Sequence, residues 1–392
     1  MKLQHIPELL EDIRQAGQYR EISDLRMKSA SLGVDRSGKE FLVFNSNDYL
    51  GMTHEPAVIE AAGKALAYGT GSGGARLTSG ASFEMRDLER EIADFKHQED
   101  ALLFNTGYMT NLGVLYALAD KNDVIFSDSL NHASIVDGCR ISRARVVVYR
   151  HSDMKDLEET LAKTPTEGQR FIVTDGVFSM DGDVALLPDL IRLKKKYDAC
   201  LIVDDAHATG VIGKTGRGTA EYWDRTSGID VQVGTLSKAL GAEGGFAAAR
   251  RDIIDVLRNR SRPFIFSTAI GPATAAAALA ALRLLEETPE TYLGRLHRNT
   301  ETMRNALTAA GIPVLPADTP ILPIVMGGEE ETVAYAAACR SDGLLLSAIR
   351  PPSVPEGTSR IRLTVTAAHK EEEIQRAAEI LITHWKKDTC RR

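Results

Sequence analysis

The segment Gly234–Gly245 reads GTLSKALGAEGG, and its one lysine, Lys238, follows an apolar run and lies among small and hydroxyl residues. A lysine on a protein surface usually has other charges and bulkier polar groups nearby. An enclosed lysine instead has a shifted pKa or a covalent partner. The alternative is an ordinary lysine on a glycine-rich loop at a strand end, and the segment alone leaves both interpretations open.

The chain around this segment predicts an α/β fold with a mostly parallel central sheet. A predicted amphipathic helix at 186–198 (LLPDLIRLKKKYD) separates two strand-like runs and has Pro188 near its start. Strand–helix–strand units in series indicate a parallel sheet covered by helices on both faces. Seven short β-rich runs are the predicted strands: 101–107, 123–128, 145–150, 171–176, 200–205, 230–235 and 244–250.

The pattern changes after Pro272, where long helices (274–287 and 293–311) precede strands at 321–327 and 359–366 and a last helix. This change predicts a second, smaller α+β domain at the C-terminal end, partly built with the N-terminal segment. We therefore expect three parts: an N-terminal segment packing with the small domain (1–50), a large cofactor-binding domain (51–275) and the small C-terminal domain (276–392).

Composition narrows the classes of protein to consider. With 392 residues, 43% hydrophobic and 26% charged, the chain can bury a large core and is ordinary for a soluble globular protein. The formal charge of −7 gives no basic footprint, so we expect no nucleic-acid partner. No signal-peptide pattern is present, and the most apolar window, near 269–285, is interrupted by Gly271, Pro272 and Arg283. Four scattered cysteines predict no disulfide framework, and a cytoplasmic enzyme without a membrane partner is the expectation.

Polar residues collect at the ends of the predicted strands, where ligands of open parallel sheets bind. Asn105–Tyr108, Asp175 with Ser179, Asp204 with His207, and Lys238 each follow a different strand. A single aspartate in such a place is commonly a turn or helix cap. Reactive groups at four strand ends together favour a binding site.

Two motifs resemble known nucleotide sites but lack their context. GTGSGG (69–74) matches G-x-G-x-x-G, yet it follows a helical pattern rather than a strand. Gly213–Thr215 resembles the end of a Walker A loop, but Ala208 stands where that loop needs its first glycine. Asp204 and His207 have no third ligand at a convincing spacing, so we expect no metal.

The strand-end residues suggest pyridoxal 5'-phosphate as the cofactor. This cofactor needs a lysine to form a Schiff base, an acid to keep its ring nitrogen protonated, and a cradle of donors for its phosphate. Lys238, Asp204 and the glycine of Asn105–Tyr108 are candidates for these roles. Protonation makes the ring an electron sink for a carbanion on the substrate.

Five segments together resemble the α-oxoamine synthases, pyridoxal-phosphate enzymes of fold type I. The segments, which span nearly the whole chain, are FNSNDYLG (44–51), NHASIVDG (131–138), VDDAHATGVIGKTGRG (203–218), TLSKALGAEGG (235–245) and SRIRLTVTAAH (359–369). The resemblance implies a homodimeric acyltransferase that condenses an amino acid with an acyl-CoA and releases carbon dioxide and CoA.

The segment 344–363 (LLLSAIRPPSVPEGTSRIRL) most resembles the biotin-pathway members of the family, which use L-alanine and pimeloyl-CoA. Two other enzymatic interpretations stay open: glycine with acetyl-CoA, or a synthase that accepts several acyl chains. A pocket discriminates one methyl group by only about 1–3 kcal/mol, so the sequence does not exclude mixed specificity. A binding protein with an idle site is the non-enzymatic alternative.

The resemblance also implies a role for each residue around the cofactor. Lys238 would bond to it and later move protons at the α-carbon of the substrate. Asp204 would pair with the ring nitrogen, His207 would bond to the phenolic oxygen with help from Ser179, and His132 would stack on the ring. For His132 the alternative is a capping or core histidine.

The phosphate and the substrates would be held by a second group of residues. Gly107 and Tyr108 would offer backbone N–H groups to the phosphate, and Thr235 would add a hydroxyl. Ser267 and Thr268 would reach the phosphate of the neighbouring subunit. The substrate-binding residues implied are Arg362 for the amino-acid carboxylate with Asn47 beside it, and Arg20 (with Arg26 as its rival) and Ser353 for the acyl-CoA.

The second carboxylate of pimeloyl-CoA needs a cation or solvent, because an unpaired buried charge is costly. Four arginines are candidates to meet it: Arg20, Arg26, Arg76 and Arg350. For each of them the alternative is a structural ion pair. We expect at least one to contribute to acyl-chain selection.

Overall fold

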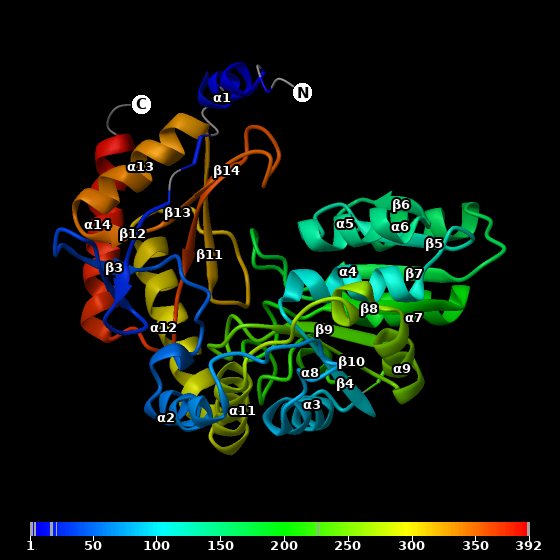
Figure 1. Ribbon diagram of the computed structural model, residues 1–392. Helices are drawn as coiled ribbons and strands as arrows, with labels where there is room; N and C mark the ends of the chain where they lie inside the picture. The colour runs from blue at the N-terminus through cyan, green and yellow to red at the C-terminus, as the bar shows by residue number, and fades with distance from the viewer. Residues whose placement is uncertain (1–2, 4, 16–18, 21, 226, 390–392) are drawn as a thin grey trace.

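A seven-stranded mixed sheet forms the centre of the computed structural model, which describes residues 3, 5–15, 19–20, 22–225 and 227–389 (Figure 1). The strand order is β4-β10-β9-β8-β7-β5-β6, with β5 to β9 parallel and β10 antiparallel to both neighbours. The seven predicted strands and the mostly parallel sheet are confirmed. The strands are β4 (Asp100–Phe104), β5 (Val124–Asp128), β6 (Arg145–Tyr149), β7 (Arg170–Asp175), β8 (Ala199–Asp204), β9 (Val231–Thr235) and β10 (Gly245–Ala249).

Both faces of this sheet are covered, which explains why its central strands are apolar without alternation. In β7, Phe171 and Val173 pack with one set of helices while Ile172 packs with another. The first set is α4 (Gly107–Leu118), α5 (Ala133–Ser142) and α9 (Arg251–Arg260), and the second is α6 (Met154–Lys163) and α7 (Leu187–Tyr197). Beside the second set, α2 (Pro56–Ala65), α3 (Phe83–Phe95) and α11 (Pro272–Glu287) cover β4 and β10.

A second body of structure contains the three-stranded antiparallel sheet β11-β14-β13 and three helices. Leu42 and Phe44 share its hydrophobic core, so the N-terminal segment packs with the C-terminal part of the chain. Helix α11 lies across the predicted boundary at residue 275, and the boundaries stay a prediction. The elements are β11 (Ile321–Gly327), β13 (Ser347–Ile349), β14 (Ser359–Thr364), α12 (Pro289–Ala309), α13 (Glu329–Ser341) and α14 (Glu371–Thr389).

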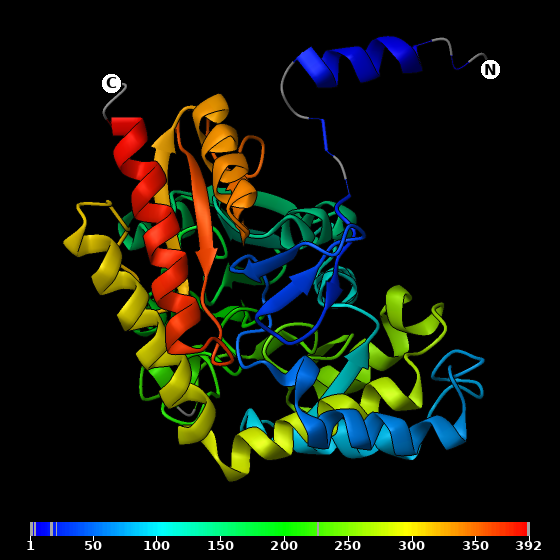
Figure 2. The same ribbon diagram turned by 90° about the vertical axis from the view of Figure 1, so that its left-hand side faces the viewer.

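A small sheet, β1-β2-β3-β12, joins the two ends of the chain, because β3 pairs in parallel with β12. Helix α1 (Ile6–Gln15) has no buried residue and stands apart from the rest of the chain (Figure 2). The remaining elements are β1 (Arg26–Met27), β2 (Leu32–Val34), β3 (Glu40–Val43), β12 (Leu344–Leu345), α8 (Thr219–Tyr222), α10 (Arg262–Ile265) and the 3-10 turns Met52–His54 and Leu66–Tyr68.

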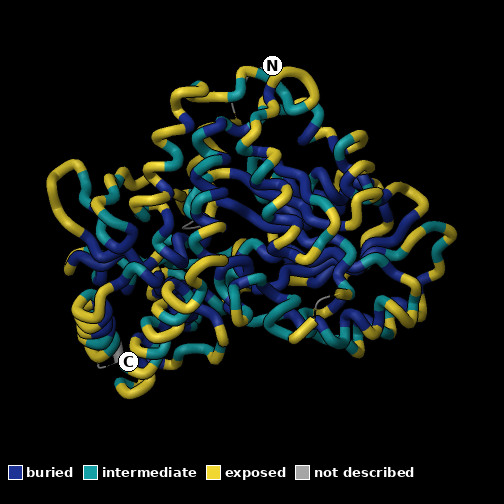
Figure 3. Tube along the Cα trace, turned by 90° about the horizontal axis from the view of Figure 1, so that it is seen from below, coloured by how far each residue is buried: buried dark blue, intermediate teal, exposed yellow. Residues whose placement is uncertain are grey.

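Burial is concentrated along the central strands, and the outer helices and loops carry the exposed residues (Figure 3). Within the described ranges, no helix combines the length and apolar character needed to cross a membrane. Cys139, Cys200 and Cys339 are free thiols, and Cys390 lies outside the described residues.

Candidate active site

Three neighbouring strands end at one place and bring their polar residues together. Asp175 and Asp204 are direct neighbours across β7 and β8, and Lys238 follows β9 in the turn after Thr235. Burial lowers the pKa of the Lys238 amine to about 8, although the negative charges of Asp204 and Asp175 oppose this. A lysine that loses its proton near neutral pH is a nucleophile and a proton carrier.

The two strand-end carboxyl groups have different surroundings. Asp204 accepts hydrogen bonds from Asn111 Nδ2 (2.6 Å) and from the backbone N–H of Ala206 (2.9 Å). Burial raises the pKa of Asp175 well above its usual range, and the nearby charge of Asp204 adds to the effect. Burial therefore favours the protonated form of Asp175, and two donors position Asp204. In the described part of the chain no cluster of His, Cys, Asp or Glu is arranged to hold a metal ion.

A buried tyrosine connects His207 with Arg362. Tyr49 lies with its hydroxyl 2.6 Å from His207 Nδ1, and Arg362 Nη2 donates to the same hydroxyl at 3.2 Å. Because a guanidinium can only donate, the single hydrogen of the tyrosine goes either to Nδ1 or to Asn47 Oδ1, and the Nδ1 contact is much the shorter (2.6 against 3.5 Å). His207 therefore carries its hydrogen on Nε2. Burial lowers the pKa of His207 well below its usual value, and the charges of Lys238 and Arg362 act in the same direction, so the ring stays neutral.

His132 begins helix α5 as its N-cap, with its ring Nδ1 accepting from the backbone N–H of Ser134. Its own backbone N–H donates to Asp175 Oδ2 at 2.7 Å. Burial lowers the pKa of His132, the charge of Lys238 lowers it further, and the charge of Asp204 opposes both. The capping role that was the alternative for this residue is present, and it places the ring beside Lys238 and Asp204.

A cradle of small residues lies at the start of helix α4. Thr106 caps the helix by accepting from Met109 N, and the first N–H groups of a helix, here those of Gly107 and Tyr108, have no partner within it. A Cβ atom on Gly245 would lie 2.6 Å from Gly107 N, so only glycine allows this approach. Thr235 borders the same cradle, because a Cβ on Gly107 would lie 3.2 Å from Thr235 Cβ.

This arrangement fits pyridoxal phosphate. The cradle offers backbone donors to a phosphate at a helix N-terminus, where anions bind, and the Thr235 hydroxyl beside them donates to the carbonyl of Gly244 at 2.8 Å. Lys238, Asp204 and His207 supply an amine, a carboxylate and an N–H donor at the adjacent strand ends. The donor set therefore contains every group that the cofactor needs.

Ser267 and Thr268 lie next to the cradle in the same chain. Thr268 is exposed, and its carbonyl accepts from Asn105 Nδ2 at 2.7 Å. The same residue forms an isolated β-bridge with Ala75. Thr268 is thus placed by contacts with two loops of its own subunit, and the role of Ser267 and Thr268 toward a neighbouring subunit stays a prediction.

The residues predicted to bind substrate lie in different places: Arg362 and Asn47 are in contact, Ser353 lines a cavity, and Arg20 lies on an exposed segment. Arg362 and Asn47 contact each other (Nη1 to Oδ1, 3.1 Å), and Arg362 Nε also donates to the carbonyl of Ser179. Ser179 and Ser353 line one cavity of about 680 Å³ between the central sheet and the loop after β13. Arg20 is exposed and lies in the segment before β1.

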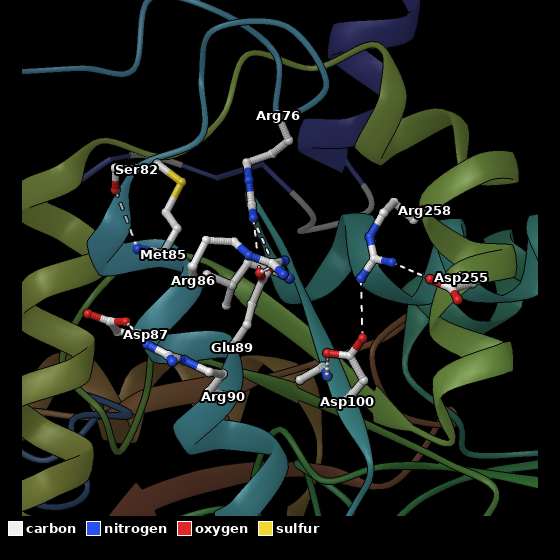
Figure 4. A network of polar contacts seen from close by, with 12 residues as sticks. Arg76, Ser82, Met85, Arg86, Asp87, Glu89, Arg90, Asp100, Asp255 and Arg258 are labelled. Atoms are coloured by element: carbon white, nitrogen blue, oxygen red, sulfur yellow. Dashed lines mark hydrogen bonds and ion pairs between the residues drawn. The ribbon is translucent and has the colours of Figure 1, made fainter.

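Of the four arginines considered for the distal carboxylate, Arg76 is already paired. Its Nη1 and Nη2 donate to the two oxygens of Glu89 at 2.9 and 3.0 Å, and Arg86 points at the same carboxylate (Figure 4). The side chains of Arg76 and Glu89 are both buried. The ion-pair alternative therefore holds for Arg76, while Arg26 is exposed and Arg350 is half-buried.

Sequence reasoning missed the roles of Tyr49 and Asn111 and gave Asp175 none. Tyr49 lies inside the motif FNSNDYLG, which drew attention to Asn47 alone. Asn111 lies four residues after Gly107, and this spacing places both on one face of α4. That spacing was a usable signal for a second polar residue beside the cofactor.

Comparison with known proteins supports the geometric assignment. The family model for aminotransferase class I and II matches residues 39–381. The chain is 47% identical to 8-amino-7-oxononanoate synthase of Geobacter metallireducens, covering 95% of this chain and 96% of the relative. It is 48% identical to 8-amino-7-oxononanoate synthase 2 of Bacillus subtilis, covering 94% of each.

Two solved structures share the architecture. One is a serine palmitoyltransferase from S. paucimobilis with bound PLP–myriocin (TM-score 0.92, 31% identity, 98% of each chain covered). The other is 8-amino-7-oxononanoate synthase from Francisella tularensis (TM-score 0.75, 27% identity, covering 89% of this chain and 99% of that one). The chain therefore belongs to the aminotransferase class I and II family, and within it to the α-oxoamine synthases, the fold type I acyltransferases that use pyridoxal 5'-phosphate.

Proposed function

We propose that the protein condenses L-alanine with pimeloyl-CoA to give 8-amino-7-oxononanoate, CoA and carbon dioxide, a reaction of biotin biosynthesis. The observation that carries the proposal is the convergence of Lys238, Asp204 and Arg362 on one site. The names of the relatives, at 42–49% identity over most of the chain, support the choice of substrates.

Each residue around the cofactor has a task that its position supports. Pyridoxal phosphate, when bound, supplies a ring that withdraws electrons from the α-carbon of the substrate. Lys238 would hold it covalently, and Asp204 would pair with its ring nitrogen. The Nε2–H of His207 would donate to the phenolic oxygen, with Ser179 nearby, and His132 would cover the ring face.

The phosphate would be bound by the backbone N–H groups of Gly107 and Tyr108 and by the hydroxyl of Thr235. We propose a homodimer in which Ser267 and Thr268 reach the phosphate bound by the partner subunit. The exposure of Thr268 beside the cradle is compatible with that contact.

The proton transfers would depend on Lys238, because its pKa of about 8 allows it to accept and return a proton near neutral pH. Its free amine would take the α-proton of the amino acid and later return a proton to the product. Arg362 would bind the amino-acid carboxylate, with Asn47 fixing the guanidinium by the 3.1 Å contact. Ser353 and Arg20 would contact the acyl-CoA, and the cavity shared by Ser179 and Ser353 lies on that route.

A panel of substrates tests the proposal. Purified protein is supplied with alanine, glycine or serine and with pimeloyl-CoA or acetyl-CoA, and CoA release is measured. We expect the highest kcat/KM for alanine with pimeloyl-CoA. A preference for glycine with acetyl-CoA would overturn it in favour of the second enzymatic interpretation, and no CoA release from any pair would overturn the enzymatic proposal.

The distal carboxylate of pimeloyl-CoA is tested separately. The measurement is the ratio of kcat/KM for pimeloyl-CoA to that for an uncharged acyl-CoA of similar length. We expect the ratio to fall when Arg20, Arg26 or Arg350 is replaced by Ala. Arg76→Ala is the control, because Glu89 occupies its guanidinium. A ratio unchanged in the first three variants would favour a solvent-exposed tail.

A further inference from the structure

A continuous chain of hydrogen bonds joins the two strand-end carboxyl groups by way of His132. The backbone N–H of His132 donates to Asp175 Oδ2 (2.7 Å), and its ring Nδ1 lies 2.7 Å from Ser134 Oγ. Asn111 Nδ2 donates to that hydroxyl at 2.9 Å and to Asp204 Oδ2 at 2.6 Å. Helices α4 and α5 and strands β7 and β8 thus all contribute to the placement of one histidine.

Counting the hydrogens along this chain assigns the tautomer of His132. The backbone N–H of Ser134 can only donate, and it points at Nδ1 (3.3 Å), so Nδ1 is an acceptor. The Ser134 hydroxyl receives a hydrogen from Asn111 and gives its own to Nδ1. The neutral ring of His132 therefore carries its hydrogen on Nε2.

The parts of this chain are held in place by close packing. Ser134 and Asn111 are buried, with 1% and 2% of their surfaces exposed. Helix α5 approaches α4 so closely that a Cβ on Gly138 would lie 3.1 Å from the carbonyl oxygen of Asn111. Asn131, the residue before His132, is also bonded to Asp175, because its Oδ1 accepts from the backbone N–H of Asp175 at 2.9 Å. The two segments are thus joined by one hydrogen bond in each direction.

We propose that Asn111, Ser134 and Asp175 are positioning residues that hold His132 in one orientation and one tautomer. The Nε2–H is then left as the polar group that the ring presents to cofactor and substrate. The assignment rests on the proposed function, in which His132 covers the cofactor ring. Asp175 acts through the backbone of His132, and Asn111 and Ser134 act through its Nδ1.

The pKa of His132 tests the tautomer directly. Hydrogen bonds donated to Nδ1 stabilise the neutral ring, so their loss raises the pKa. In full-length protein labelled with ¹³C-histidine, titrated by NMR before and after adding pyridoxal phosphate, we expect Ser134→Ala to raise the His132 pKa toward its ordinary value. Ser142→Ala is the control, because Ser142 is also buried on α5 and donates to Cys139 O. An unchanged His132 pKa in Ser134→Ala would overturn the assignment.

Steady-state kinetics test the role of Asp175. Asp175→Asn keeps an oxygen that accepts from His132 N–H, and Asp175→Ala removes it. We expect kcat to fall by about tenfold in Asp175→Ala, with little change in KM for alanine, and to stay near the wild-type value in Asp175→Asn. Equal losses in both variants would overturn positioning by this bond. A wild-type protein inactive on every substrate pair would overturn the proposed function instead, and the His132 titration would still decide the tautomer.

Discussion

Asp204 is the last residue of β8 and Asp205 follows it directly, and their side chains serve two different regions of the molecule. Successive strand residues point to opposite faces, so one aspartate faces Lys238 and the other faces Lys96. Asp205 Oδ2 lies 2.8 Å from Lys96 Nζ, and neither side chain of this pair is exposed. Lys238 is half-buried, and in the described part of the chain Asp204 acts on it through its negative charge alone, without a hydrogen bond.

The difference between the two regions shows how one strand end serves both stability and chemistry. Lys96 Nζ has two acceptors, Asp205 and the carbonyl of Arg217 (2.6 Å), which take two of its three hydrogens in a buried environment. Within the described part of the chain, Lys238 Nζ makes no such bond and its pKa is lowered to about 8. A lysine without a bonded carboxylate is free to react, whereas a paired one only holds structure.

The largest effect that separates the two regions is expected for Lys238→Ala. Removal of the amine should lower kcat by about 10³-fold or more, because both the attachment of the cofactor and the proton transfers depend on it. The visible absorbance of the bound cofactor should disappear, while the midpoint of urea unfolding of the cofactor-free protein stays within error. Lys195→Ala, at an exposed lysine on α7, is the control. Activity retained by Lys238→Ala would show that Lys238 is not the lysine that binds the cofactor.

Lys96→Met, the matching change in the buried Lys96–Asp205 pair, should lower the stability of the fold. It leaves Asp205 buried without its ion-pair partner, with the backbone N–H of Thr219 as a remaining donor (3.2 Å), and such a loss typically costs about 3–5 kcal/mol of unfolding free energy. Urea unfolding measures the loss, and Lys96→Met with Asp205→Asn should recover part of it. Folded protein should still attach the cofactor through Lys238. A single variant as stable as the wild type would mean that the pair contributes nothing.

The elements of the fold follow from periodicity, because each strand and helix around the central sheet has a local pattern. The convergence of Lys238, Asp204 and His207 also follows, since parallel strands deliver their ends to one edge. Asn111 was missed because a polar residue inside a helix is normally exposed. The packing of α4 on the sheet makes it a partner of Asp204, and the close approach of α5 makes it a partner of Ser134.

Arg76 illustrates a different limit, because the sequence left both a substrate contact and a structural ion pair open and only the structure shows the ion pair. Its position in a glycine-rich loop gave no sign of a partner, because Glu89 lies thirteen residues further along, on α3. Long-range pairs of this kind depend on how a loop folds back on a helix. No periodic pattern in the sequence carries that information, so the four arginines could be ranked only after the fold was known.

The pH dependence of cofactor attachment reports the pKa of Lys238. The neutral amine is the nucleophile, so the rate at which cofactor-free protein gains its visible absorbance should rise as pH increases through about 8 and level off above it. Below that pH the rate should fall by about tenfold per unit, as the amine becomes protonated. An unshifted lysine would keep rising toward pH 10, which would contradict the lowered pKa.

The smallest effect is expected from Tyr49→Phe, which removes one hydroxyl from the region around Lys238. Tyr49 is fully buried, so the phenylalanine ring fills the same space, but His207 loses a donor and Arg362 loses an acceptor. The loss of about one net hydrogen bond predicts a rise in KM for alanine of about five- to tenfold. The absorbance of the bound cofactor should also shift, because His207 is no longer fixed as the Nε2–H tautomer.

Tyr335→Phe is the matched control for this variant. Its hydroxyl donates to the carbonyl of Leu381 at 2.7 Å in the core of the C-terminal part, away from the strand ends. Its removal should lower the unfolding midpoint slightly and leave KM for alanine unchanged. If both variants raised KM alike, the effect would come from general loosening of the protein. If neither variant raised KM for alanine, the role of Tyr49 would be structural only, like that of Lys96.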